Sequence, residues 1–273
     1  MNIDGREVEI SHPDKPLYPE DGITKQQIAE YYVKVAPYML PIIKDRPVVM
    51  QRFPEGIHGE AFFQKEASEY FPKWIKTVTV DLIKGGKQHL VLIDSAATLA
   101  YLANQGALTL HIWLSTRPHI HKPDRMVFDL DPSEDNFDKI KRAAWIIKAT
   151  LEGRGYSPRL MTTGSRGLHV IAPLKPNRDF ETVHKETQAI AEEIRQREPD
   201  LLTTEARIAK RGKKVYLDVA RNSYGQTQVA PYSLRALSGA PVATPISWEE
   251  LEKLQSSRQY NLNNIDSRLR GLN

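Results

Sequence analysis

The stretch Met126-Val127-Phe128-Asp129-Leu130-Asp131-Pro132 ends an apolar run with two acids that stand two residues apart. In a β-strand, side chains at this spacing point to the same face and lie about 7 Å from each other. Two carboxylates at the end of a buried strand repel each other and lose hydration unless a cation joins them. The pair therefore predicts a divalent-metal site, although acids with this spacing also occur on solvent-facing strand ends.

The elements around this stretch alternate between strand and helix patterns without a regular βαβ rhythm. Thr24 is the predicted N-cap of a helix that ends near Tyr38. Asp135 or Asn136 caps a second predicted helix, which runs to residue 152, and further helices are predicted over 96–105, 180–197 and 248–254. Strands are predicted over 48–53, 78–83, 108–113, 125–130, 159–163, 168–172 and 215–219. This mixture predicts an α/β (α+β) fold with a mixed β-sheet core flanked by helices.

The composition limits the function only broadly. The 273 residues can bury a sizeable core in one large domain or two closely packed lobes. Lysine and arginine exceed the acids by only 38 to 34, so a surface that binds phosphates must be a local patch. The absence of cysteine excludes disulfides, thiolate zinc sites and a cysteine nucleophile. No signal peptide opens the chain and no apolar run approaches the ~20 residues of a membrane span, so we expect a cytoplasmic protein.

A third acid, Asp218, lies among apolar residues in the predicted strand over 215–219. Alternation along that strand places its side chain on the same face as Tyr216 and Ala220. Asp218 is either a surface acid at a strand end or the third member of a carboxylate cluster. Such a cluster is able to hold two metal ions about 3.5–4 Å apart.

The turn Gly164-Ser165-Arg166-Gly167 joins two predicted strands, the second of which carries His169. Its glycines let the backbone approach a ligand closely, and successive N–H groups can form an anion-binding nest. Ser165 adds a hydroxyl and Arg166 a permanent charge, so the turn favours phosphate binding. His169 either joins that site or is a partly buried histidine that is satisfied within its strand. The glycine spacing does not match a Walker loop.

Two positions allow both a structural and a functional interpretation. Arg235 follows the rigid Ala230-Pro231-Tyr232 segment and is either a surface residue or a planar partner for a triphosphate. His111 is as typical of a core histidine as of a ligand contact.

The N-terminal part of the chain holds a second ambiguous group. Lys15 and Lys25 flank a proline-rich loop, where lysines are solvated by default. Phe62 and Phe63 are typical of a core, although an exposed ring here would be able to stack on a base.

In chain order, these elements resemble the polymerase domain of bacterial ligase D, the repair polymerase of non-homologous end joining, within the archaeo-eukaryotic primase superfamily. The motifs that carry the resemblance are Phe128-Asp129-Leu130-Asp131-Pro132, Thr163-Gly164-Ser165-Arg166-Gly167-Leu168-His169, Tyr216-Leu217-Asp218 and the segments 229–235, 239–251, 14–19 and 24–25. The resemblance covers nearly the whole chain. The resemblance implies a mixed-sheet core of the primase type with an RRM-like catalytic half. It also implies one primase-polymerase domain over 1–273, with a DNA-end-binding part over 1–105 and a catalytic part over 106–273.

The resemblance further implies a role for each matching residue. The metal ligands, for Mn²⁺ or Mg²⁺, are expected to be Asp129, Asp131 and Asp218. The incoming NTP or dNTP is expected to contact His111 at the sugar and Ser165, Arg166, His169 and Arg235 at the phosphates. Lys15 and Lys25 are expected to bind the 5′-phosphate across a DNA gap or break, and Phe53 and Phe63 to contact the template. The chain departs from the family at Arg166, where lysine is usual, and at Arg221, where glutamine is common.

The function implied by the resemblance is template-directed nucleotidyl transfer by a two-metal mechanism, filling gaps at double-strand breaks with a preference for ribonucleotides. The expected partners are 5′-phosphorylated gapped or broken DNA, a separate ATP-dependent DNA ligase and a Ku-type end-binding protein at the nucleoid. Three alternatives stay open. A primase would start chains without a primer, a non-catalytic end-bridging protein would not need the acids, and a nuclease would not need the triphosphate residues.

Overall fold

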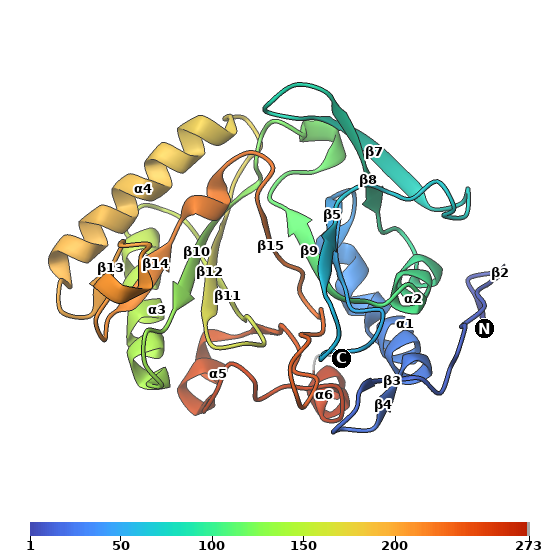
Figure 1. The fold of residues 1–273 in the computed structure, drawn as a ribbon. Helices are drawn as coiled ribbons and strands as arrows, with labels where there is room; N and C mark the ends of the chain where they lie inside the picture. The colour runs from blue at the N-terminus through green and yellow to red at the C-terminus, as the bar shows by residue number, and fades with distance from the viewer. Residues whose placement is uncertain (272–273) are drawn as a thin grey trace.

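Two β-sheets stand side by side, and each is covered by helices on the side that faces away from the other (Figure 1). The computed structural model describes residues 1–271, so the last two residues of the expected domain lie outside the described part. The predicted mixed-sheet α/β (α+β) class is confirmed.

The first sheet has the strand order β13-β14-β10-β12-β11-β16 and is antiparallel except for the pair β13–β14. Met126, Phe128 and Leu130 of its central strand belong to the core beneath helices α3 and α4, while Asp129 and Asp131 alternate with them. Its elements are β10 (Arg125–Asp131), β11 (Arg159–Thr162), β12 (Leu168–Pro173), β13 (Leu202–Thr203), β14 (Val215–Asp218), β16 (Pro245–Ile246), α3 (Phe137–Glu152) and α4 (Phe180–Arg197).

The second sheet has the order β15-β9-β5-β8-β7, with β6 paired to β5, and helices α1 and α2 pack on it. The chain returns to this second sheet after it has built most of the first one. Strand β15, which pairs with β9, follows β14 of the first sheet in the sequence. Its elements are β5 (Pro47–Arg52), β6 (Phe62–Gln64), β7 (Lys76–Asp81), β8 (Lys87–Leu92), β9 (Ala107–Trp113), β15 (Thr227–Val229), α1 (Lys25–Ile43) and α2 (Ala96–Asn104).

Short elements complete the fold. They are β1 (Asn2–Ile3) paired with β2 (Arg6–Glu7), β3 (Pro16–Tyr18) paired with β4 (Ile23–Thr24), α5 (Trp248–Lys253), α6 (Ile265–Arg270) and the 3₁₀ turns η1 (Arg117–His119), η2 (Ile208–Lys210) and η3 (Ala220–Asn222). Among residues 1–271, no helix is both long and apolar enough to span a bilayer.

The predicted helix starts rest on local chemistry and are confirmed. Thr24 caps α1 in a capping box with Gln27, and Asn136 caps α3. The predicted end of the first helix at Tyr38 is wrong, because α1 continues to Ile43 through Pro37 and Pro41. Both prolines lie on the exposed face, while the opposite face of the helix stays packed.

Two strand predictions need correction. The strand predicted over 78–83 is β7, which ends at Asp81, and Leu82 and Ile83 are 43% and 81% exposed in the turn to β8. The strand predicted over 215–219 ends at Asp218, whose carboxylate accepts the Ala220 N–H at 2.8 Å and starts η3. Ala220 therefore does not continue the alternation on the face of Asp218.

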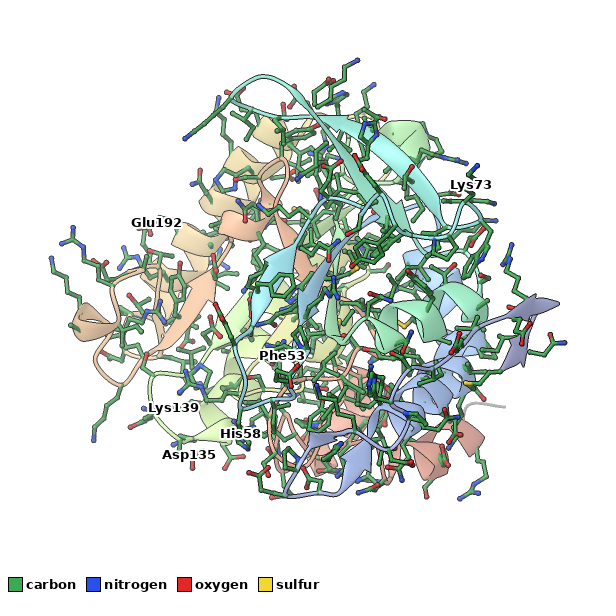
Figure 2. All side chains as sticks on the ribbon, turned by 45° about the vertical axis from the view of Figure 1, so that its right-hand side comes forward. Phe53, His58, Lys73, Asp135, Lys139 and Glu192 are labelled. Carbon is green, nitrogen blue, oxygen red and sulfur yellow. The ribbon has the colours of Figure 1, made fainter. Side chains whose placement is uncertain are left out.

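The structure corrects the burial expected for the phenylalanines. Phe62 and Phe63, predicted as core, are 45% and 58% exposed, on the short strand β6 that pairs with β5 beside the main strand order of the sheet. Phe53, expected to contact the template, is 6% exposed and belongs to the core of the α1–α2 side. The ring of Phe53 is therefore not available for stacking on a base. The charged side chains of Glu192 and Lys73, by contrast, project from the surface (Figure 2).

Candidate active site

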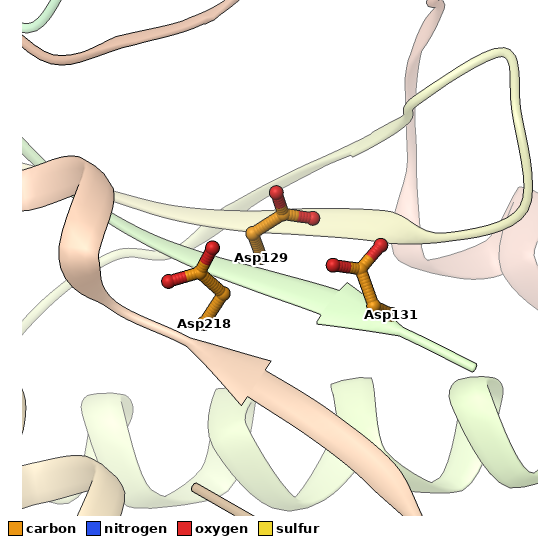
Figure 3. Close-up of side chains that lie close together, drawn as sticks. All are labelled: Asp129, Asp131 and Asp218. Atoms are coloured by element: carbon orange, nitrogen blue, oxygen red, sulfur yellow. The ribbon is translucent and has the colours of Figure 1, made fainter. Parts of the chain in front are cut away.

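Three carboxylates meet on the face of the first sheet that lies opposite α3 and α4 (Figure 3). Asp129 on the central strand β10 stands opposite Asp218 on β14 and opposite His169 on β12. Asp131 follows two residues later on the same strand and the same face. Asp129, Asp131 and Asp218 each offer an oxygen within 4.8 Å of the others, so the sequence spacing does bring the acids together.

The side chains of Arg221 and His169 both approach Asp129, which is only 2% exposed. The Arg221 Nε donates to Oδ2 at 2.5 Å, and the His169 Nε2 lies 3.3 Å from Oδ1. From the described residues, 1–271, no hydrogen bond reaches that second oxygen. Burial alone would raise the pKa of Asp129, but the electrostatic interaction with His169 and the charge and hydrogen bond of Arg221 lower it below its ordinary value.

Asp131 experiences the opposite environment. Burial and the neighbouring charges of Asp129 and Asp218 raise the pKa of Asp131 to about 6. A buried oxygen without a donor on Asp129 and a carboxyl that resists ionisation both indicate that the cluster lacks positive charge. Hard oxygen ligands in this number fit Mg²⁺ or Mn²⁺, so the three residues suit the metal ions that the sequence predicted.

The raised pKa of Asp131 predicts a pH-dependent metal affinity. A metal ion needs the ionised carboxylate, so binding at pH 5 must displace a proton from a group with a pKa of about 6. We expect the apparent Kd for Mn²⁺ to be about tenfold weaker at pH 5 than at pH 7.5, by titration calorimetry without nucleotide.

The same shift sets the stability of the metal-free protein. The folded-state pKa of Asp131 exceeds the usual value of an aspartate. The stability that Asp131 contributes to the folded state is therefore present at low pH and is lost as pH rises towards about 6. Mn²⁺ should therefore raise the Tm more at pH 7.5 than at pH 5. Asp131→Asn should remove most of this difference, and equal Mn²⁺ shifts at both pH values in the unmodified protein would contradict the assignment.

Hydrogen bonds hold the shape of the turn between β11 and β12. They involve the first residue of the turn and residues in the C-terminal part of the chain. The Thr163 hydroxyl accepts the N–H groups of Ser165 and Gly167 at 3.3 and 3.2 Å. Ser257 donates to the Gly167 carbonyl at 2.7 Å, and Arg258 donates to the Ser165 carbonyl at 3.0 Å. Ser165 is thus partly exposed on a fixed backbone and Arg166 is exposed at its tip, beside a pocket of about 500 Å³.

Gly167 lets this turn pack directly on the acid strand. A Cβ atom here would lie 2.0 Å from the carbonyl oxygen of Leu130, which precedes Asp131. We expect Gly167→Ala to lower the free energy of unfolding in urea by about 2–3 kcal/mol, because the backbone must shift. Gly153→Ala is the control, since this glycine has φ −61° and its nearest contact would be 3.4 Å away. Equal stability of the two variants would show that the turn does not need the close approach.

His111 and Arg235 approach the same region from the second sheet and its C-terminal extension. Burial, followed by the charges of Arg235 and Arg221, lowers the pKa of His111 to about 3, so its ring is neutral at physiological pH. Its Nε2 is buried without a partner, and the exposed ring of Phe63 lies 5.7 Å away, edge to face. Arg235 donates to the Thr163 carbonyl at 3.2 Å, which ties it to the base of the turn.

Lys15 and Lys25 form a separate cationic pair at the start of α1. Lys25 is 8% exposed, and its ammonium donates to the Ser11 hydroxyl at 3.3 Å. Lys15 is paired with the exposed Glu55 at 2.7 Å. Burial, and then the charge of Lys15, lower the pKa of Lys25, so the pair has more positive charge than the surrounding protein compensates. A doubly charged anion would supply the missing compensation.

Four residues that shape these sites were not identified as site residues from the sequence: Glu55, Asn222, Ser257 and Arg258. Asn222 is fully buried and binds both the N–H and the carbonyl of Val127, which fixes η3 against β10. Arg258 and Ser257 reach the turn from about 90 positions away in the chain. None of the four lies in a pattern that distinguishes it from a surface polar residue.

The comparisons with known proteins agree with this geometry. A family model described as LigD, primase-polymerase domain, matches residues 24–273. The multifunctional non-homologous end joining protein LigD of Pseudomonas aeruginosa is 33% identical over 264 residues, which are 96% of this chain and 31% of that protein. The bifunctional non-homologous end joining protein LigD of Bacillus subtilis is 32% identical over 259 residues, 94% of this chain and 41% of that protein. The chain spans less than half the length of both relatives.

Among the solved structures that match, one is similar to this chain over nearly the full length of both chains. The polymerase domain from Mycobacterium tuberculosis ligase D, in complex with DNA, has a TM-score of 0.90 and 32% sequence identity to this chain. The match covers 97% of this chain and 94% of that one. The similarity therefore includes both sheets and the face on which the carboxylates meet.

Proposed function

The chain belongs to the LigD primase-polymerase family, and from this membership and the geometry of its site we propose that it is a template-directed polymerase that fills gaps at DNA double-strand breaks in non-homologous end joining. The observation that carries the proposal is the meeting of Asp129, Asp131 and Asp218 beside the turn that Ser165 and Arg166 occupy. A carboxylate cluster next to an anion-binding turn suits the transfer of a nucleotide from a triphosphate.

In the proposed reaction, the primer 3′-hydroxyl oxygen forms a bond to the α-phosphorus of the bound nucleotide, and the bond to pyrophosphate breaks. Two divalent cations, Mn²⁺ or Mg²⁺, held by Asp129, Asp131 and Asp218 would acidify the hydroxyl and neutralise the leaving group. Ser165, Arg166, His169 and Arg235 would position the phosphates through their N–H and O–H donors. The proton leaves to solvent, since the neutral His111 is a poor base.

The selection of the sugar is assigned to His111. Its neutral ring has a free, buried Nε2 and is packed by Phe63, so it can exchange a hydrogen bond with a 2′-hydroxyl without paying for a buried charge. We therefore expect ribonucleotides to be preferred. Phe63, which is 58% exposed, is proposed to stack on the template strand, while the buried Phe53 is not.

We assign binding of the DNA end to the N-terminal part of the chain and catalysis to the part that follows it. Lys15 and Lys25 are proposed to bind the downstream 5′-phosphate of a gap, because their positive charge is only partly compensated. A separate ATP-dependent ligase and a Ku-type end-binding protein are the proposed partners, in the cytoplasm at the nucleoid. The proposed single domain has an end-binding part over 1–105 and a catalytic part over 106–273.

One assay tests the proposed function. Gapped DNA with a labelled primer and a 5′-phosphate is incubated with Mn²⁺ and either NTPs or dNTPs, and the products are separated on a gel. We expect templated extension to the end of the gap, faster with NTPs. Synthesis without any primer would favour the primase alternative, and primer shortening would favour a nuclease. DNA binding without extension would favour an end-bridging protein, and a clear dNTP preference would overturn the role of His111.

A further inference from the structure

Arg221 already occupies part of the carboxylate cluster with its positive charge. Its Nε donates to Asp129 Oδ2, and its terminal nitrogen donates to the Thr227 carbonyl at 3.2 Å. Asp129 is the central acid of the cluster, opposite both Asp218 and His169. The guanidinium thus stabilises the acid that the proposed mechanism assigns to metal binding. It supplies the charge that a metal ion would otherwise supply.

The charges near the cluster explain why a cation is needed there. Three carboxylates converge within 4.8 Å, and Asp129 is almost completely buried. Buried carboxylates are stable only when a partner compensates them. Arg221 is the permanently charged residue that pairs with Asp129, and His169 lies further from it, at 3.3 Å.

The anchoring of Arg221 allows its side chain to move without unfolding the site. The side chain is 34% exposed, so part of it is in contact with solvent. Its backbone lies in η3, which the fully buried Asn222 fixes to β10 through two hydrogen bonds to Val127. The guanidinium can therefore leave Asp129 while η3 and the acid strand keep their positions.

From this arrangement we infer that Arg221 is the resident counter-ion of the metal-free cluster, competes with the first divalent cation for Asp129, and so sets the affinity for metal. The inference rests on the proposed metal-dependent function. Two like charges that share one carboxylate repel each other, so the metal ion binds at the expense of the ion pair. The opposite possibility is that Arg221 remains on Asp129 and orients it for the metal, as outer-sphere partners of metal ligands do.

The two possibilities predict opposite effects of removing the charge. Arg221→Gln should bind the first Mn²⁺ about tenfold more tightly than the unmodified protein, measured by calorimetry without nucleotide or DNA. The metal-free variant should melt at a lower temperature, and Mn²⁺ should raise its Tm by more. Arg221→Lys keeps the charge and should bind Mn²⁺ much like the unmodified protein. Weaker binding by Arg221→Gln would overturn the competition and leave Arg221 as an orienting partner.

Arg178→Gln is the matched control. Arg178 pairs with Glu186 on α4, away from the cluster, and its side chain has the same 34% exposure as that of Arg221. It should leave Mn²⁺ affinity unchanged. If the unmodified protein binds no Mn²⁺ at millimolar concentration, both this inference and the metal step of the proposed function fail. If it binds Mn²⁺ and Arg221→Gln binds no more tightly, only the inference fails.

A measurement on the unmodified protein does not depend on the folding of any variant. In ¹⁵N-labelled protein, the Arg221 Nε–H should be a slowly exchanging resonance, which Arg221→Lys identifies by its absence. Saturation with diamagnetic Mg²⁺ should shift this resonance and speed its exchange with solvent, because the bond to Asp129 breaks. A resonance that is unchanged at saturation would overturn the displacement.

Discussion

Replacing Asp129 and Asp131 together with asparagine is expected to reduce primer extension by at least about 10³-fold while DNA binding changes little. Both side chains keep their shape, but the cluster of Asp129, Asp131 and Asp218 loses two of its three charges. The loss falls on the reacting phosphate, because the proposed DNA contacts lie elsewhere. Repulsion within the cluster also disappears, so the fold should tolerate the change despite the loss of the Arg221 ion pair.

Extension is measured on a gapped substrate with Mn²⁺, and binding by fluorescence polarisation with the same DNA. Asp135→Asn is the control, because this exposed acid lies in the loop that follows Asp131 and is not part of the cluster. It should retain near-normal extension. Robust extension by the double variant would refute the assignment of the acids, whereas loss of binding in parallel would indicate damage to the fold.

The strands that carry the acids could be predicted because their pattern is local. An apolar run with acids at alternate positions determines which side chains share a face, and β10 has this alternation. Helix starts were equally accessible, since Thr24 and Asn136 act on backbone groups within three residues. The end of α1 was not, because the packing of its inner face overrides the local effect of Pro37 and Pro41.

The partners of the charged residues could not be predicted from the sequence for a different reason. Arg221 and Asp129 are 92 residues apart, and Lys15 and Glu55 are 40 apart. No periodicity relates such positions, so the sequence does not identify the acid with which Arg221 or Lys15 pairs. The exposure of Phe63 could not be predicted from the sequence either. An aromatic pair has the same sequence pattern in an edge strand as in a buried strand.

The second large effect is expected at the DNA end, from Lys15→Met combined with Lys25→Met. Methionine keeps the apolar part of each side chain, so the packing of the buried Lys25 is largely retained. The pair loses two charges that would each form a charge-assisted hydrogen bond with a 5′-phosphate. We expect the preference for a 5′-phosphorylated gap over a 5′-hydroxyl gap to fall by at least about tenfold, and towards one.

The preference is the ratio of the two dissociation constants, measured at several salt concentrations in the unmodified protein and in each variant. Lys34→Met is the matched control, because Lys34 lies on the same helix α1 but pairs with Asp266 on the surface. It should preserve the ratio. If the double variant instead weakens binding to both substrates equally, the two lysines are general backbone contacts, since a specific pocket must distinguish an end that carries a phosphate from one that does not. Because Glu55 already neutralises part of Lys15, the larger share of the effect should come from Lys25, and the single variants would show this.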